Sequence, residues 1–342
     1  MKTYEITIKP LSGFGTPLKG DTIFGHICWQ AFYDEKIFGM KIEELLNEYE
    51  KNPFLVTSTA YLKVGNGYTL KRPEMPVDLL FKVEKYDERE VIRQRKELKK
   101  KKWMFLQKNT SLMSLRSEDL YLNDEELLNK LLEYSDLETK RYISKKSISS
   151  VIIDFTQPHN SINRLTGTTG EGQFAPYGVE QKVYIPEIEL VIFVALREDI
   201  SIDSVKEALN RIGKSGFGKD ASTGLGRFEI LSYSEIDLKS IGSDNPNALY
   251  TLSPCVLKDF SIKDVFFSPF IRFGRHGDVF AKSGKPFKNP IIMADEAAVI
   301  ILKDKNIFTK PYIGSSIRGI SKIEPKTVTQ GYSLYIPVKV EE

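Results

Sequence analysis

Alternating apolar and polar residues open the chain and predict a β-strand over Thr3–Leu11. A helix over 21–33 follows, because apolar residues recur on one of its faces and Asp21 is a good N-cap. That face consists of Ile23, Phe24, Ile27, Cys28, Ala31 and Phe32. A second helix is predicted over about 41–49, and a strand with β-branched residues over 54–62.

The strand-like alternation and the helix-like spacing of apolar residues both recur near the middle of the chain. The apolar run over Glu189–Leu196 predicts a core strand, and a strand is also predicted over 228–233. Between them, a helix over 201–212 would bury one face, with Gly213 as its C′ residue. Without residues 63–183 the order is strand, helix, strand, strand, helix, strand, as in ferredoxin-like (RRM-like) domains. The helix over 41–49 is an addition to that order.

Residues 63–183 are predicted to form a large insertion. Two charged helices are expected, over 87–103 and over 123–134, the second capped by Asn123. The lysine run 99–102 fits either a solvated helix end or a phosphate contact. A strand over 151–155, a glycine- and threonine-rich tip at 167–172 and a strand from Val183 complete the insertion.

The second half of the chain changes in composition. Breakers and polar residues over 236–247 indicate a linker. Beyond it, apolar runs over 249–257, 265–273, 291–293, 297–302 and 332–340 predict strands. The expected fold class is therefore α+β. It comprises a ferredoxin-like domain over 1–235 with its insertion, and a β-rich domain over 248–342, for which a second ferredoxin-like unit is one option.

The overall composition argues against a disulfide framework, a zinc site and a membrane span. The formal net charge of +3 is too small to indicate a nucleic-acid partner, so such binding must come from local patches. Two distant cysteines, Cys28 and Cys255, argue against a disulfide framework or zinc site and fit a reducing cytoplasm. No apolar run is long enough for a membrane span. We expect a cytoplasmic protein with no membrane contact, metal or other cofactor.

The segment 213–226, called the glycine loop below, is the strongest candidate for binding chemistry. Glycines let backbone amides approach an anion closely, and the cations and hydroxyls within or next to the loop suit phosphate. A purely connecting loop is the alternative. The candidate RNA-binding residues here are Lys214, Gly216, Gly218, Lys219, Ser222, Thr223, Gly224, Gly226 and Arg227.

Nucleotide-binding motifs do not fit this loop. A Walker A loop needs glycine at the position of Ala208, and a dinucleotide fingerprint joins a strand to a helix, whereas this loop joins a helix to a strand. No strand carries the RRM aromatic signature, so binding through loops rather than a sheet face is expected.

Two further places suggest RNA contact. Lys19 and Gly20 precede a helix N-terminus, which binds anions, although a simple helix start explains them equally well. The polar residues His159, Asn160, Asn163 and Arg164 lie beside the glycine-rich tip, and the nearby Phe174 and Tyr177 are expected to pack beneath it. A separate basic stretch over 272–288 suits RNA or a protein partner equally well. It contains Arg272, Arg275, Lys282, Lys285 and Lys288.

Four segments together resemble a known family. They are Pro17–Trp29, His159–Arg164 with Phe174–Tyr177, Gly216–Phe228 and Val328–Pro337. In this order they resemble the RAMP-superfamily subunit that caps the CRISPR RNA (crRNA) 5′ handle in the Csm, or type III-A, effector complex. The resemblance extends over nearly the whole chain, whereas the glycine loop alone would indicate only the superfamily.

The resemblance implies a non-catalytic subunit. Such proteins bind the 5′ handle of crRNA and join the large polymerase-like CRISPR signature subunit to the RAMP backbone subunits of the Csm complex. It also implies a ferredoxin-like first domain and an inserted β-hairpin thumb, here expected near 151–185.

Two other functions stay open from the sequence. Related RAMP proteins cleave precursor crRNA without metal, often through a histidine near the first helix, where His26 lies. A structural histidine is the more common explanation in so apolar a helix. A protein-only scaffold is the other option, and the glycine loop with Arg227 argues against it.

Overall fold

The computed structural model describes residues 1–83, 87–108, 110–258, 262–303, 308 and 310–341. Its main sheet has the strand order β10-β1-β9-β3-β4-β5-β6, with β2 also paired to β9. The strands are β1 (Lys2–Pro10), β2 (Leu55–Thr57), β3 (Tyr61–Val64), β4 (Gly67–Lys71), β5 (Trp103–Gln107), β6 (Tyr121–Leu122), β9 (Glu189–Leu196) and β10 (Phe228–Glu235). β1 lies between β9 and β10 and is antiparallel to both.

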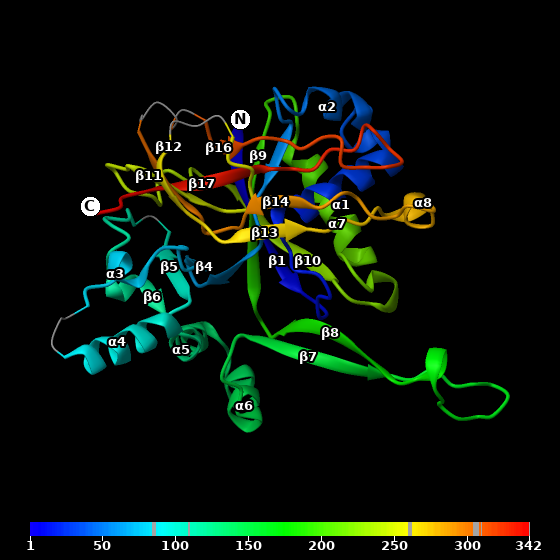
Figure 1. Ribbon diagram of the computed structural model, residues 1–342, viewed down its shortest axis with the longest axis horizontal. Coiled ribbons are helices and arrows are strands. Elements are labelled where there is room, and N and C mark those ends of the chain that lie inside the picture. Colours follow the sequence, from blue (N-terminus) through cyan, green and yellow to red (C-terminus); the bar gives the residue numbers. More distant parts are fainter. Residues whose placement is uncertain (84–86, 109, 259–261, 304–307, 309, 342) are drawn as a thin grey trace.

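Helices α1 (Gly20–Tyr33) and α7 (Ile202–Ser215) pack beside each other against this sheet (Figure 1). Together with the central strands they give the predicted order strand, helix, strand, strand, helix, strand. The apolar faces explain the packing: Phe24 and Ile27 of α1 and Val205 and Ile212 of α7 are buried. The short helix α2 (Ile42–Glu48) follows the 3-10 turn Glu35–Ile37, as an addition to this order.

Several element boundaries differ from the sequence predictions. Helix α1 begins at Gly20 after Lys19, so Asp21 is not its N-cap. Helix α7 continues to Ser215, so Gly213 is a helical residue and not the C′ residue. The strand predicted over 54–62 is two strands. Between them the chain turns toward the C-terminal half, where the Thr59 amide donates to the Leu252 carbonyl at 2.8 Å.

The insertion extends the main sheet and adds helices beside it. Strands β4, β5 and β6 were not predicted, and the helix predicted to Trp103 ends at Lys100. The helices are α3 (Val77–Leu80), α4 (Glu88–Lys100), α5 (Asp124–Tyr134) and α6 (Leu137–Lys146), with a 3-10 turn at Glu118–Leu120. The predicted cap of α5 is confirmed, because Asn123 and Glu126 form a reciprocal capping box.

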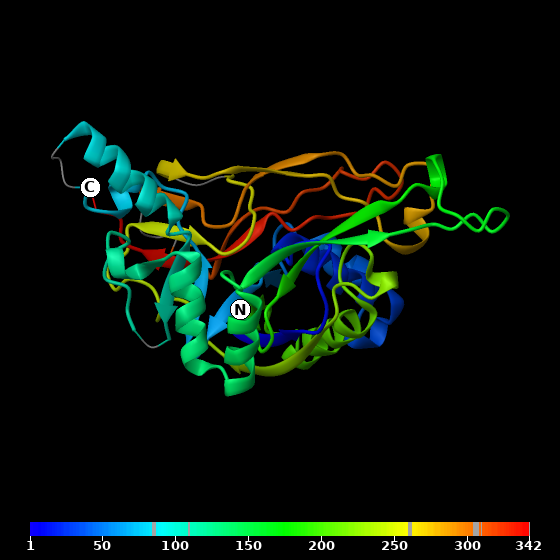
Figure 2. The ribbon, with the colours of Figure 1, turned by 90° about the horizontal axis from the view of Figure 1, so that it is seen from below.

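The thumb is the hairpin of β7 (Ile152–His159) and β8 (Tyr177–Tyr184), with a 3-10 turn at Gly172–Phe174 near its tip. The two strands pair in antiparallel register from Ile152–Tyr184 to His159–Tyr177. Figures 1 and 2 show it projecting from the body toward the end of the molecule that carries α8 (Asp278–Ala281). Most of its strand residues are exposed, whereas Ile152, Ile153 and Tyr184 at its base pack against the core.

The C-terminal half is β-rich, as predicted, and lies on one side of the N-terminal sheet (Figure 2). Its five-stranded sheet has the order β12-β15-β11-β17-β16, and β13 pairs with β14. The strand predicted over 265–273 is two strands in the structure. The elements are β11 (Ala248–Thr251), β12 (Ile262–Phe266), β13 (Pro269–Arg272), β14 (Ile291–Ala294), β15 (Val299–Leu302), β16 (Tyr312–Gly314) and β17 (Tyr332–Val338).

One hydrophobic core joins the two halves. Phe193 of the main sheet and Tyr250 and Leu334 of the C-terminal sheet belong to the same buried cluster. The Gln330 side chain reinforces this junction, accepting from the Thr57 amide at 2.9 Å and donating to the Thr57 carbonyl at 2.8 Å. Ile241, within the predicted linker, is also buried. The domain boundaries given above stay a prediction.

Candidate nucleic-acid interface

The glycine loop begins in the last turn of α7, leads to β10 and is folded tightly against the segment 12–16. The Gly226 amide donates to the Gly13 carbonyl at 2.7 Å, and the Phe217 amide donates to the Gly226 carbonyl at 2.9 Å. A Cβ at Gly226 would lie 2.2 Å from the Phe217 carbonyl oxygen, and its φ of 74° favours glycine. Glycine is therefore required here by close backbone packing.

Side chains of the same segment bind other amides of the loop. Thr16 Oγ1 accepts from the Lys219 amide and Ser12 Oγ accepts from the Arg227 amide, both at 2.9 Å. These amides are not free for an anion, contrary to the expectation that the loop presents its backbone N–H groups. The loop instead exposes side chains, those of Lys214, Lys219, Ser222, Thr223 and Arg227.

His26 lies beneath the loop as a structural residue. Its Nε2 accepts from the Gly218 amide at 3.3 Å, and its ring packs on Phe217 with centroids 4.5 Å apart. Burial lowers the pKa of His26 to about 4, so the imidazole is neutral at neutral pH. Because the amide already occupies the Nε2 lone pair, the geometry favours the structural interpretation of His26 over the catalytic one.

A cleft of about 620 Å³ separates α1 and the glycine loop from the C-terminal stretch that follows β13. Lys219 lines one wall, and Arg275 and Lys288 line the opposite wall. The glycine loop and the basic stretch 272–288 are far apart in the sequence, and the fold brings them together at the cleft. His276 and Asn289 add polar groups to the same cleft.

The cations of the cleft are not equally available. Arg272 binds both carboxylate oxygens of Asp21, at 2.6 and 2.8 Å, so its charge is neutralised. Lys219 is itself exposed, and its ion pair among the described residues is with the half-buried Asp220 next to it, at 3.7 Å. The Lys288 amine has no hydrogen bond or ion pair with any described residue, and burial lowers the Lys288 pKa. Lys219, Arg275 and Lys288 thus leave the cleft positively charged.

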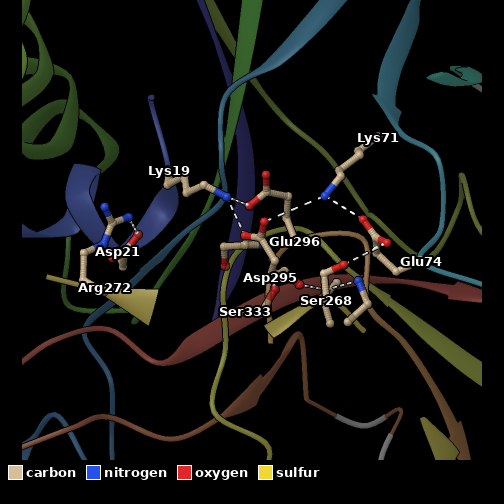
Figure 3. A network of polar contacts seen from close by, with 12 residues as sticks. Lys19, Asp21, Lys71, Glu74, Ser268, Arg272, Asp295, Glu296 and Ser333 are labelled. Atoms are coloured by element: carbon tan, nitrogen blue, oxygen red, sulfur yellow. Dashed lines mark hydrogen bonds and ion pairs between the residues drawn. The ribbon is translucent and has the colours of Figure 1, made fainter. Parts of the chain in front are cut away.

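Lys19 lies in the junction between the two halves (Figure 3). The Lys19 amine contacts Asp295 and Glu296, both at 2.5 Å, and only 12% of its side chain is exposed. A Cβ at Gly20 would lie 2.4 Å from the Thr57 carbonyl oxygen. From the sequence, an anion site and a simple helix start explained Lys19 and Gly20 equally well. The geometry favours a structural role for both residues.

The polar residues of the thumb lie away from the cleft. His159 ends β7 and stacks on Tyr177, with ring centroids 5.4 Å apart and planes 14° apart. Asn163 Oδ1 accepts from the Leu165 amide at 2.9 Å, which shapes the tip, and Asn160 and Arg164 are exposed. None of the thumb residues predicted to contact RNA lines the cleft. Tyr177 is exposed, whereas the sequence favoured a packed position for it.

The base of the thumb and the glycine loop share one support. Phe14 and Lys182 exchange two backbone hydrogen bonds, at 2.9 and 3.0 Å, and the Phe14 ring meets Tyr184 edge-on. Gly13 and Thr16 in the same segment bind the glycine loop. The segment 12–16 therefore couples the position of the thumb to that of the loop. No local pattern in the sequence marks this segment, because its role depends on contacts with distant residues.

The part of the chain that the structure describes contains neither a metal site nor a membrane-spanning helix. No group of three or more His, Cys, Asp or Glu side chains there is placed to hold a metal ion. The described helices are all too short or too polar to cross a membrane.

Sequence comparison identifies no relative: no protein-family model and no curated protein matches the chain. Structural comparison does. A chain in a Csm1–Csm4 cassette with pppApA has a TM-score of 0.58 and 16% identity, with 100% of both chains covered. A chain in the Csm3–Csm4 subcomplex of a type III-A CRISPR-Cas interference complex has a TM-score of 0.54 and 15% identity, with 99% of this chain and 100% of that one covered.

Csm4 is the subunit that the two assemblies have in common. The full coverage means that the likeness includes the thumb and the C-terminal half as well as the main sheet. The chain therefore shares an α+β fold over its whole length with chains of these Csm assemblies, as the resemblance in the sequence predicted.

Proposed function

We propose that this chain is a non-catalytic RNA-binding subunit of a type III-A CRISPR (Csm) effector complex. In that role it holds the 5′ handle of crRNA and joins the large polymerase-like subunit to the RAMP backbone subunits. The observation that carries the proposal is the cleft in which Lys219 faces Arg275 and Lys288. A single-stranded RNA backbone is bound by such grooves of cations, with exposed rings nearby to stack its bases.

The shared fold supports the choice of complex and partners. One structural neighbour is a chain of an assembly of Csm1 with Csm4, and another comes from an assembly of Csm3 with Csm4. An equivalent subunit would contact a Csm1-like protein and a Csm3-like protein. Arg227 and the exposed arm of the thumb extend the proposed RNA path beyond the cleft.

The test measures binding of a fluorescent RNA with a repeat-derived 5′ handle by anisotropy, over a range of salt concentrations. The variant Lys219→Ala/Arg275→Ala should bind more weakly, with a salt slope reduced by about 1.4, because about 0.7 is lost per phosphate contact with a single strand. The control Lys239→Ala/Lys303→Ala removes two exposed lysines that do not line the cleft. Equal affinity and slope for the two double variants would remove the cleft from the RNA path.

The same samples address the alternative of a metal-independent ribonuclease. RNA incubated with the protein and a chelator should stay intact for wild type and for His26→Gln. Cleavage by wild type that is lost in His26→Gln would establish the nuclease and contradict the non-catalytic proposal. If RNA does not bind to the chain either alone or with its partner subunits, a protein-only scaffold would replace both proposals.

A further inference from the structure

A small apolar groove adjoins the cleft. Its volume is about 190 Å³, and it lies between the C-terminal part of α1, helix α2 and the loops around His276 and Val328. Gly25, Trp29, His276 and Lys288 line both the groove and the cleft. The two hollows therefore meet at the Trp29 ring.

Three aromatic residues near the end of α1 form what we call the α1 aromatic group: Trp29, Phe32 and Tyr33. The Trp29 and Tyr33 rings are stacked with centroids 5.8 Å apart, and Phe32 meets Trp29 edge-on at 5.5 Å. Phe32 and Tyr33 are 48% and 53% exposed. Two aromatic rings near the groove thus stay accessible to a ligand.

The charges around the two hollows differ. The cleft lining has four cations, Lys219, Arg272, Arg275 and Lys288, and two carboxylates, Asp21 and Asp220, whereas the groove lining has two carboxylates, Glu43 and Glu324, and two amines, Lys288 and Lys326. A phosphate is therefore favoured in the cleft, and an uncharged ring is favoured in the groove. Lys288 stands where the two meet and can bind a phosphate next to such a ring.

The size of the groove limits which ligands can fit in it. Sites for drug-sized ligands are about 300–1,000 Å³, so a hollow of about 190 Å³ suits a single ring system and not a whole nucleotide. Indole and phenyl faces stack on any nucleobase, because every base has a π-face. A base next to the cleft would thus find an aromatic surface on Trp29 and a cation at Lys288.

We propose that the groove takes one base of a single-stranded RNA, stacked on the α1 aromatic group, while the adjoining phosphates lie in the cleft. This inference rests on the proposed function, since it needs an RNA strand in the cleft. It adds a binding site for a base, in addition to the phosphate contacts of the glycine loop. An apolar side chain of a partner protein is the competing occupant.

Fluorescence of Trp29 tests the proposal. The chain has two tryptophans, so Trp103→Phe leaves Trp29 as the only emitter. Trp103 lies on β5, outside the linings of the groove and the cleft, and its indole donates to Asp124 at 2.7 Å. Handle RNA should quench the remaining emission. In a series of RNAs with one abasic nucleotide each, one position should lose the quenching and bind about 5- to 150-fold more weakly.

A double-mutant cycle separates stacking from a loss of folding. Trp29→Leu should weaken binding of intact RNA, and the abasic site should then cause no further loss, because both changes remove the same contact. Trp29→Phe keeps a ring and should restore most of the affinity. The matched control Phe267→Leu changes an exposed ring that lines neither the groove nor the cleft, and it should leave the abasic effect unchanged.

The possible failures are distinguishable. If RNA binds with the salt dependence set by Lys219 and Arg275, but no abasic position weakens binding or quenching, the base site is overturned and the proposed function stands. If partner subunits quench Trp29 without RNA, and RNA then has no further effect, the groove binds protein and the inference is wrong. If RNA does not bind at all, both proposals fail.

Discussion

The Arg272–Asp21 ion pair should contribute strongly to stability, because it joins α1 to β13 across the cleft. Only 2% of the Asp21 side chain is exposed, and both of its oxygens accept from Arg272. Arg272→Ala would leave that carboxylate buried without its partner, which typically costs 3–5 kcal/mol. Because 21% of Arg272 is exposed, water can reach part of the vacated space. We therefore expect a loss near the lower end, about 3 kcal/mol.

The assay is urea unfolding followed by circular dichroism, with the loss in stability taken from the shift in midpoint at constant slope. Arg275→Ala is the matched control, since Arg275 belongs to the same segment but is exposed, and it should change stability by no more than about 0.5 kcal/mol. Arg272→Lys keeps the charge but loses the bidentate geometry and should give an intermediate loss.

The double variant Asp21→Ala/Arg272→Ala should be more stable than Arg272→Ala alone, because it leaves no buried charge unpaired. The reasoning would be refuted by an Arg272→Ala protein that unfolds at the wild-type urea concentration. A double variant that shows the simple sum of the two single losses would refute it as well.

Three other changes have defined outcomes. Gly226→Ala should destabilise by about 1–3 kcal/mol, because of its φ of 74° and its contact with Phe217, whereas Gly25→Ala, with open space around its Cβ, should stabilise α1 by about 0.5–1 kcal/mol in thermal unfolding. The contribution of His26 to stability should fall by roughly 3 kcal/mol as pH falls from 6.5 to 4, since the unfolded chain binds a proton that His26 does not; it is measured as the difference between wild type and His26→Gln, and equal pH profiles of the two proteins would contradict it. Burial and the neighbouring Asp295 raise the Glu296 pKa to about 7, so the contribution of Glu296 has the opposite sign to that of His26: it should be lost as pH rises from 4.5 through 7, as the difference between wild type and Glu296→Gln would show.

Helices and strands whose apolar residues recur with a clear local period could be predicted from the sequence. β1, β9, β10, α1 and α7 occur close to where the sequence placed them. The missed elements have weak local signals. β4 and β6 are short, and α6 carries four basic residues and little apolar surface, so their placement depends on the neighbouring sheet.

The candidate site shows the same limit. The exposed cations of the glycine loop were identified from the sequence, but the role of its glycines was not. Whether their amides are free depends on the segment 12–16, about 200 residues away, whose hydroxyls and carbonyls bind them. Asp21 likewise suits a helix cap locally, and only the folded chain brings Arg272 to it. The groove at Trp29 could not be predicted, because its walls come from both halves of the chain.

The most direct test of the central claim is a residue-level crosslinking map of crRNA on this chain in the assembled effector complex. Photoreactive nucleotides placed along the 5′ handle should crosslink to the glycine loop around Lys219 and to the stretch 272–288 across the cleft. Crosslinks from the handle that fall on other surfaces, with both walls of the cleft unlabelled, would contradict the account.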